Sequence, residues 1–231
     1  MTHLPDSIGE LKQLTYLKFG AVTTSGCNSI LTLPKTIGQC TSLRELDMTK
    51  CKFLKELPEE LGNLSINLHE LNLRECKALT ALPSSIGNLI QLHEISLSKC
   101  TGITVLPLSM KLLMNLERLN LSKCTGLTTE SNVLGSVIRY LSSLQILNMR
   151  GCKNILSFSE LEEGDLPSLV SWDLRGCKKL QNVPVSIKNL KGRLKNLDVR
   201  QCPNFHGVHA HVGLAELVDA GCTVLKDEAA K

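Results

Sequence analysis

Cysteine is the residue in this chain whose number and spacing could do chemistry. The 231 residues include ten cysteines. Seven of them recur at steps of 24 to 28 residues, at Cys51, Cys76, Cys100, Cys124, Cys152, Cys177 and Cys202. A cysteine that returns at such an interval could form a disulfide, bind a metal, act as a reactive thiol or fill a packing position. The sequence around each cysteine decides among these roles.

One segment, "CPNFHGVHAH", gathers residues that could bind a metal: Cys202, His206, His209 and His211. Their spacing matches no standard zinc pattern, and Cys202 already belongs to the periodic set. No Gly-rich phosphate loop ending in Lys-Ser or Lys-Thr is present, and no Ser/His/Asp set can be placed. We therefore expect no enzyme activity, no metal and no cofactor, and rank a role for the 202–211 segment last.

The composition favours a folded protein in a reducing compartment. Hydrophobic residues make up 42% of the chain and aromatic residues 3%, and the net charge is +4. A nucleic-acid partner is not expected, because no dense basic stripe with aromatic residues is present. No secretory signal pattern and no stretch of membrane-spanning length is seen. We expect a cytoplasmic protein with no membrane contact, whose cysteines remain free thiols.

Each periodic cysteine closes the same sequence frame. Leucine-like residues stand at its first, fourth and sixth positions and the cysteine at the ninth, as in "LRELDMTKC", "LHEISLSKC" and "LQILNMRGC". The alternation from Leu92 through Ile95 and Leu97 predicts a strand with one buried face. The preceding "LPSSIGNLIQL" places Ile86, Leu89 and Leu92 three residues apart, which favours a short helix or 3-10 turn. One copy cannot bury its leucines alone, so the copies must stack.

The expected architecture is a single α/β solenoid domain spanning residues 1–231, with about eight repeats. A parallel sheet lines its concave face, and short helices and 3-10 turns cover its convex face. Strands are expected near 14–19, 43–48, 68–73, 92–97, 116–121, 144–149, 169–174 and 194–199. Residues 213–231 are interpreted as a degenerate repeat or C-terminal cap, in which Leu214 to Leu225 keep the frame and Cys222 takes the cysteine position. Asp219 then stands where the frame needs an apolar residue.

Departures from the repeat predict special local structure. The segment 20–26, "GAVTTSG", is interpreted as an inserted loop, either a tolerated insertion or a contact loop. The apolar spacing between Val133 and Leu141 predicts a true α-helix on the convex side. Trp172 occupies a leucine position and is expected in the core, as is Cys40. His69 and His93 occupy equivalent positions of adjacent repeats and should be neighbours.

The frame L-x-x-L-x-L-x-x-C resembles the leucine-rich repeat. With "LPKTIGQC", "LPEELGNL" and "LPSSIGNL", the chain resembles the repeat region of plant intracellular disease-resistance proteins, which carry a nucleotide-binding domain and leucine-rich repeats. The resemblance implies a curved horseshoe and a non-enzymatic recognition module in plant-type immunity or intracellular signalling. The alternative is the substrate-recognition part of a ubiquitin-ligase receptor, which would need an F-box-like segment upstream.

The variable strand positions should project from the sheet and align in columns across repeats. Glu45, Glu70 and Glu94 form an acidic ladder, whereas Arg150, Arg175 and Arg200 form a basic ladder. These charges either pair with one another and keep the sheet soluble, or dock a protein partner of unknown identity. We expect docking, by a monomer unless the first repeat self-associates. The candidate residues are Tyr16, Lys18, Glu45, Asp47, Glu70, Asn72, Arg74, Glu94, Ser96, Ser98, Arg118, Asn120, Asn148, Arg150, Asp173, Arg175, Asp198 and Arg200.

Overall fold

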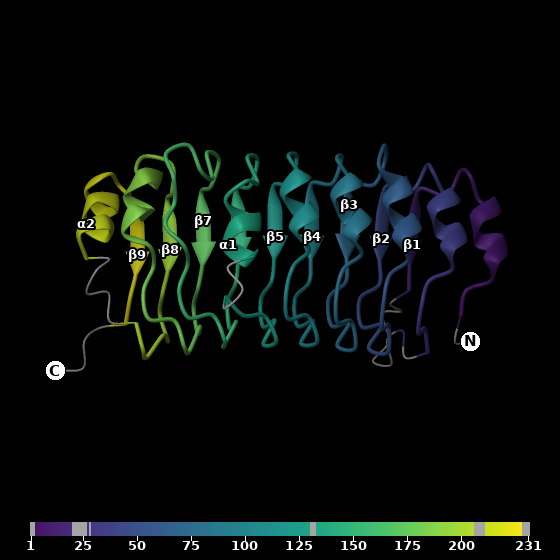
Figure 1. The fold of residues 1–231 in the computed structure, drawn as a ribbon, viewed down its shortest axis with the longest axis horizontal. Coiled ribbons are helices and arrows are strands. Elements are labelled where there is room, and N and C mark those ends of the chain that lie inside the picture. Colours follow the sequence, from purple (N-terminus) through teal and green to yellow (C-terminus); the bar gives the residue numbers. More distant parts are fainter. Residues whose placement is uncertain (1–2, 20–26, 28, 130–132, 206–210, 228–231) are drawn as a thin grey trace.

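A single sheet of parallel strands runs the length of the molecule (Figure 1). The computed structural model describes residues 3–19, 27, 29–129, 133–205 and 211–227. Within these residues nine strands pair in sequence order, each with the next along the chain. They are β1 Tyr16–Lys18, β2 Glu45–Asp47, β3 Glu70–Asn72, β4 Glu94–Ser96, β5 Arg118–Asn120, β6 Ile146–Asn148, β7 Ser171–Asp173, β8 Asn196–Asp198 and β9 Thr223–Leu225.

The first eight strands each fall within one of the ranges expected from the sequence, and each is three residues long. Their middle residues face the core, as Leu46, Ile95 and Leu147 do. The residues on either side of the middle one face outward, because side chains alternate between the two faces of a strand. The predicted α/β solenoid with a parallel sheet is confirmed.

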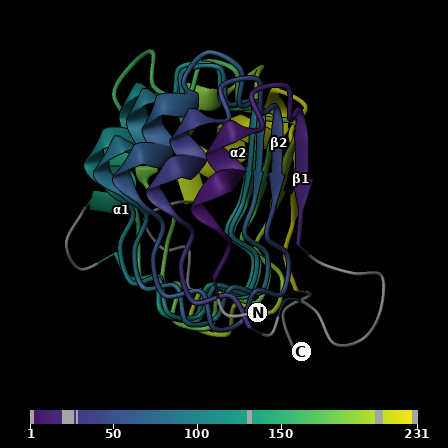
Figure 2. The same ribbon diagram turned by 90° about the vertical axis from the view of Figure 1, so that its right-hand side faces the viewer.

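A second layer of short helices lies across the core from the sheet (Figure 2). Each 3-10 helix follows a proline, whose fixed φ and missing N–H suit the first turn of a helix. These helices are η1 Asp6–Glu10, η2 Lys35–Gln39, η3 Glu59–Leu64, η4 Ser84–Asn88, η5 Leu108–Leu112 and η6 Val185–Leu190. The α-helix expected after Cys124 is confirmed as α1 Val133–Ile138, and a second α-helix, α2, spans His211–Asp219.

Glycine lets neighbouring 3-10 helices approach closely. A Cβ atom added at Gly87 would collide with the carbonyl oxygen of Ser109 in the next repeat. One added at Gly62 would lie 2.6 Å from the Cβ atom of Ser85, well inside van der Waals contact. The Ile-Gly and Leu-Gly pairs of "SSIGN" and "EELGN" thus bury an aliphatic side chain and leave room for the neighbouring backbone at the next position.

Six of the seven periodic cysteines hydrogen-bond their repeat to the previous one. The thiol of Cys124 donates to the carbonyl oxygen of Leu97 at 2.9 Å, and that of Cys76 to Met48 at 3.2 Å. Equivalent bonds join Cys100 to Leu73, Cys152 to Leu121, Cys177 to Met149 and Cys202 to Leu174. All ten cysteines are free and buried.

Burial sets the chemistry of these thiols as well as their packing. It raises the pKa of Cys76, Cys124 and Cys177 to about 12 in each case, because a thiolate is poorly solvated in the core. The described cysteines are therefore buried packing elements and not cross-links, and six of the periodic ones also satisfy a backbone carbonyl. Cys40 and Trp172 are also buried, as predicted.

The residue before each periodic cysteine adopts a left-handed backbone conformation. Its φ is 63° at Lys50, 62° at Lys99, 60° at Lys123 and 74° at Gly151. Glu75, Gly176 and Gln201 complete the set with φ values of 64°, 75° and 59°. This turn ends the strand and sends the chain back over the core, so it is a fixed feature of the repeat.

The last repeat differs from the frame assigned to it. Residues expected to follow the strand pattern form α2, and the strand β9 comes after Cys222 and pairs with β8. The strand frame would have placed Asp219 in the core, whereas the helix buries Leu214 and Leu217 and leaves Asp219 exposed. The predicted inserted loop at 20–26 and the metal-type residues His206 and His209 lie outside the described residues.

Candidate functional site

The strand register brings the predicted columns together on the open face of the sheet. Glu45 lies opposite Glu70, Glu70 opposite Glu94, and Glu94 opposite Arg118. The same register continues to Ile146, Ser171 and Asn196, and Tyr16 precedes Glu45. Side chains from repeats about 25 residues apart in sequence thus become immediate neighbours, about 4.8 Å apart along the sheet.

The second column, which runs from Asp47 to Asp198, uses much of its hydrogen-bonding capacity within the fold. The side chain of Asp47 accepts a hydrogen bond from the backbone N–H of Thr49 at 2.8 Å, two residues on. Asn72, Asn120, Asn148, Asp173 and Asp198 make the same turn with residues 74, 122, 150, 175 and 200. These oxygen atoms shape the strand exit, which is a structural role that the sequence columns did not reveal.

The third column lies two residues after the second in each repeat and contains the basic ladder. Its three arginines differ in how far their guanidinium groups are already hydrogen-bonded within the fold. Arg200 Nη2 lies 2.6 Å from Asp198 Oδ2, and Arg200 Nε donates to Asp198 Oδ1 at 3.0 Å. Arg175 Nε donates to the side chain of Gln201 at 3.2 Å. Arg150 is exposed and forms no ion pair with any described residue. The part of the ladder that best presents a free guanidinium is therefore Arg150.

The serines of this column are only partly available to a partner. Ser98 is 6% exposed, and its hydroxyl lies 2.8 Å from that of Ser122 in the next repeat. The two hydroxyls satisfy each other across the repeat boundary, so Ser98 contributes little surface to the concave face.

The acidic ladder is only partly neutralised. Arg118 Nε lies 2.7 Å from Glu94 Oε2 and its Nη1 3.6 Å from Glu117 Oε2. Within the described residues, Glu45 and Glu70 have no ion-pair partner within 4 Å. At the end of the sheet, Lys18 Nζ lies 3.1 Å from Asp47 Oδ2. Ion pairs between neighbouring side chains thus account for some of the charges on this face, and Glu45 and Glu70 are left without such a pair.

His69 and His93 are neighbours, as their equivalent sequence positions predicted. Their rings stack with centroids 5.3 Å apart and planes inclined by 14°. Both side chains are half-buried, directly before β3 and β4, and His93 Nδ1 has no hydrogen-bond partner among the described residues. The two imidazoles therefore form a face-to-face pair beside the acidic ladder.

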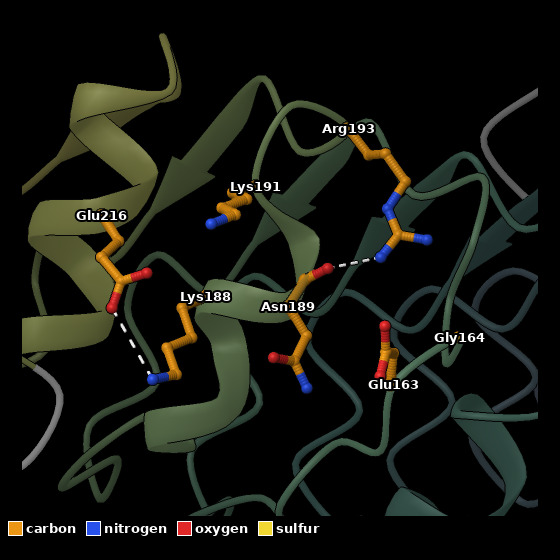
Figure 3. Close-up of a pocket in the computed structure, with 7 residues that line it drawn as sticks. All are labelled: Glu163, Gly164, Lys188, Asn189, Lys191, Arg193 and Glu216. Atoms are coloured by element: carbon orange, nitrogen blue, oxygen red, sulfur yellow. Dashed lines mark hydrogen bonds and ion pairs between the residues drawn. The ribbon is translucent and has the colours of Figure 1, made fainter.

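Sequence reasoning missed a surface pocket at the other end of the molecule (Figure 3). It measures about 600 Å³ and is lined by Glu163, Gly164, Lys188, Asn189, Lys191, Arg193 and Glu216. Lys188 Nζ lies 3.7 Å from Glu216 Oε1, and Arg193 donates to the carbonyl of Asn189. The dense cations of "KNLKGRLK" could have signalled it, and Glu163 and Glu216 offset part of their charge.

The described residues contain no group of three or more His, Cys, Asp and Glu side chains placed to hold a metal ion. None of the helices in the described part of the chain has the length and apolar character needed to cross a membrane.

Comparisons with known proteins agree with this geometry. The Leucine Rich Repeat family matches residues 42–64. The leucine-rich repeat domain of the type III effector XopL superposes with a TM-score of 0.78 at 26% identity, covering 98% of this chain and 73% of that one. A TDR receptor superposes with a TM-score of 0.55 at 21% identity, covering 97% of this chain and 40% of its own. No match was found among curated protein sequences.

A single architecture, the repeat solenoid, therefore explains the open sheet, the helical layer and the cysteine-closed frame. Solenoids of this kind bind other proteins on their extended concave surface. The chain has the leucine-rich repeat fold, an architecture typical of non-enzymatic protein recognition.

Proposed function

We propose that this chain is a non-enzymatic recognition module that binds a protein partner across its concave sheet. The observation that carries the proposal is the register of the sheet, which aligns unlike side chains into columns along an open face. A rigid backbone presenting exposed, variable positions can match an extended partner without changing its own fold.

Arg150 is the best anchor that this face offers. It is exposed, it lies between Ser122 and Arg175 in its column, and its guanidinium is not committed to a carboxylate of the described residues. Arginine is enriched among residues that dominate binding energy, because its planar fork forms paired hydrogen bonds with carboxylates. Arg175 and Arg200 would then extend a basic region that steers an acidic part of the partner.

We further propose that this recognition serves an intracellular pathway of the plant immune or signalling type. Ten free cysteines are typical of a reducing, cytoplasmic environment. The "LPSSIGNL" and "LPEELGNL" segments support the link to plant intracellular resistance proteins by resemblance.

Site-specific photo-crosslinking tests the concave face directly. A photoreactive amino acid would be placed at Ile146 or Ser171 on the sheet, or at Lys35, an exposed residue of the convex helix η2. The full chain would then be incubated with cytosol and irradiated. We expect discrete adducts from the sheet positions and none of the same mass from Lys35. Adducts formed only from Lys35 would move the binding surface to the convex side and refute the proposal.

Charge reversal provides a second readout. The triple variant Arg150→Glu, Arg175→Glu, Arg200→Glu should lose capture of the crosslinked partner and keep its far-UV circular dichroism. The matched control reverses Lys153, Lys178 and Lys179, which are exposed and follow the periodic cysteines. Equal loss in both triple variants would show a general effect of charge instead of a specific ladder.

A further inference from the structure

Three large apolar side chains project into solvent at the same position of three consecutive repeats. Ile66, Ile90 and Met114 are 75%, 51% and 51% exposed. Each lies in the turn that leads from a 3-10 helix into a strand, from η3 to β3, from η4 to β4 or from η5 to β5. We call these three residues the apolar rim. Isolated exposed apolar residues are ordinary, whereas a contiguous set at equivalent positions marks an interaction surface.

The apolar rim is confined to the third, fourth and fifth repeats. The equivalent residue of the preceding repeat is Thr41, and that of the following repeat is Ser142. Leu112 and Tyr140, 50% and 52% exposed, occupy matching positions at the helix ends nearby and widen the patch. The fold itself does not need apolar residues here, because neighbouring repeats build the same turn with hydroxyl side chains.

Hydrogen bonds fix the shape of this edge. Asn115 Nδ2 donates to the carbonyl oxygen of Ile90 at 2.8 Å, and Asn67 Nδ2 donates to that of Thr41 at 2.8 Å. Within one turn, the backbone N–H of Ile90 donates to Asn88 at 2.8 Å. A partner would therefore meet a preformed surface and would not have to order it, which lowers the entropy lost on binding.

The apolar rim lies close to the His69–His93 pair and the acidic ladder. His69 and Glu70 follow Ile66 by three and four residues, and His93 and Glu94 follow Ile90 by the same intervals. Four residues of chain span at most about 14 Å, so these three kinds of side chain lie within reach of one partner segment. Moving from the edge onto the sheet, the surface changes from aliphatic to imidazole to carboxylate.

The carboxylates give this surface its charge preference. Glu45, Glu70 and Glu94 lie directly opposite one another on β2, β3 and β4. Like charges in such positions destabilise a sheet. Arg118 neutralises Glu94, whereas Glu45 and Glu70 have no ion pair within the described part of the chain. Arg44 and Glu117 occupy the positions on either side of the two histidines, and Glu117 lies 3.6 Å from Arg118.

We propose that the apolar rim and the acidic ladder together bind a partner segment that carries arginine beside large aliphatic or aromatic side chains. The apolar side chains would cover Ile66 and Ile90, and a guanidinium would reach the carboxylates of Glu45 and Glu70. Arginine fits better than lysine, because its planar guanidinium can donate two parallel hydrogen bonds to one carboxylate. This inference rests on the proposed recognition function and names the partner chemistry at one end of the concave face.

A peptide selection with the full chain tests the preference without assuming a sequence. A random twelve-residue library would be panned against the protein, and enriched peptides would be scored for composition. We expect enrichment of arginine together with leucine, isoleucine or phenylalanine. Enrichment of acidic peptides, or of peptides with no charge preference, would overturn the proposal.

Defined peptides then measure the two contributions separately. Fluorescein-labelled peptides of equal length would contain arginine with leucine, glutamate with leucine, or arginine with serine. By fluorescence anisotropy, the arginine–leucine peptide should bind at least about tenfold more tightly than either other peptide, and less tightly at high salt. Equal binding of the arginine and glutamate peptides, or no binding of any peptide, would refute the inference.

Variants locate the site. Ile66→Thr, Ile90→Thr and Met114→Ser together imitate the neighbouring repeats and should weaken the arginine–leucine peptide about tenfold. The matched control is Phe53→Ser, Val185→Thr and Val218→Thr, which removes exposed apolar side chains elsewhere.

The carboxylates are tested separately. Glu45→Gln with Glu70→Gln should weaken binding and flatten its salt dependence, whereas the control Glu56→Gln with Glu163→Gln should do neither.

The outcomes separate this inference from the proposed function. If the rim variants bind as wild type while crosslinks from position 146 persist, the concave face still recognises proteins and the apolar rim has no part in it. If crosslinks from the sheet are also absent, both proposals fail together.

Discussion

The thiol of Cys100 donates a hydrogen bond to the carbonyl oxygen of Leu73, 2.9 Å away in the preceding repeat. Both groups are buried, so the bond replaces the water that neither can reach. Similar bonds recur along the chain and give the periodic cysteine a physical reason. A residue at this position must be small, mostly apolar and able to donate one hydrogen bond, and cysteine combines these properties.

Replacing Cys100 by serine should lower stability without removing an activity. The shorter C–O bond moves the donor away from Leu73, and a hydroxyl is costlier to bury than a thiol. We expect a loss of about 1–3 kcal/mol in the free energy of unfolding, measured by urea denaturation. The control Thr101→Ser changes an exposed neighbour and should be neutral. A variant as stable as wild type would show that the thiol bond contributes nothing.

Thiol reactivity should report the same burial. With a pKa of about 12, Cys76, Cys124 and Cys177 are almost entirely protonated at pH 8. Only about one in 10⁴ would be thiolate, which is the reactive form. We expect no labelling of these three by iodoacetamide in the native protein on a timescale that labels all ten cysteines in urea. Peptide mapping by mass spectrometry would identify the sites, and rapid native labelling of Cys124 would contradict the assignment.

Glu59 should make stability depend on pH in the acidic range. Its carboxylate accepts backbone hydrogen bonds from Ser85 and Ser84 at the start of η4, and these bonds lower its pKa. Because the folded pKa is lower than the unfolded value of about 4.3, the stabilisation is complete above that value and lost as pH falls through the folded pKa.

The variant Glu59→Gln removes this carboxylate. It should cost roughly 0.5–1 kcal/mol near pH 7 and little below pH 3, since the protonated carboxyl also loses its charged acceptor. Thermal melts from pH 7 down to pH 3 would measure the difference between variant and wild type. A destabilisation that stays constant over this range would exclude the carboxylate as its source.

Gly87→Ala should destabilise the stack of helices. The added methyl group would meet the carbonyl oxygen of Ser109, a backbone atom that cannot rotate away. We expect a loss of about 1–3 kcal/mol, the usual range for overpacking. Lys111 occupies the equivalent position of the next repeat and is exposed, so Lys111→Ala is the matched control and should change stability little. Thermal melting midpoints compare the two, and equal midpoints would argue against close helix packing.

The left-handed turn offers a reciprocal test. Lys123 has a φ of 60°, in the left-handed region of backbone conformation. This conformation is strained for any residue that has a Cβ atom and is not strained for glycine. Lys123→Gly should therefore be neutral or stabilise by up to about 1 kcal/mol, whereas Gly151→Lys should destabilise by a similar amount. The denaturation midpoint of Gly151→Lys should fall, and that of Lys123→Gly should stay the same or rise. A loss of stability in Lys123→Gly would mean that its side chain makes an unrecognised contribution.

The repeat frame predicted the fold well because one physical requirement governs every copy. Leu46, Leu71 and Ile95 must each face the core, so their spacing determines the strand and its register. Within the described residues, the frame differs from the structure over residues 214–222. There, Leu214 and Leu217 satisfy helical spacing as well as strand spacing, and Asp219 is acceptable only in the helix.

The candidate surface was less predictable than the fold. Columns follow from register, so Glu45 and Glu70 could be placed together from sequence alone. The use of Asp47 or Asn120 to close a turn depends on side-chain geometry, which spacing does not reveal. The apolar rim escaped notice because Ile66 and Ile90 lie in a segment of variable length, where one repeat has an extra residue and the alignment breaks.

The thiol hydrogen bonds also bear on how the number of repeats can change in evolution. Each bond reaches only the immediately preceding repeat, as from Cys124 to Leu97. A whole unit could therefore be duplicated or deleted and its neighbours would find equivalent partners at once. The length of the solenoid, and with it the footprint offered to a partner, can be altered by recombination without redesigning any interior contact.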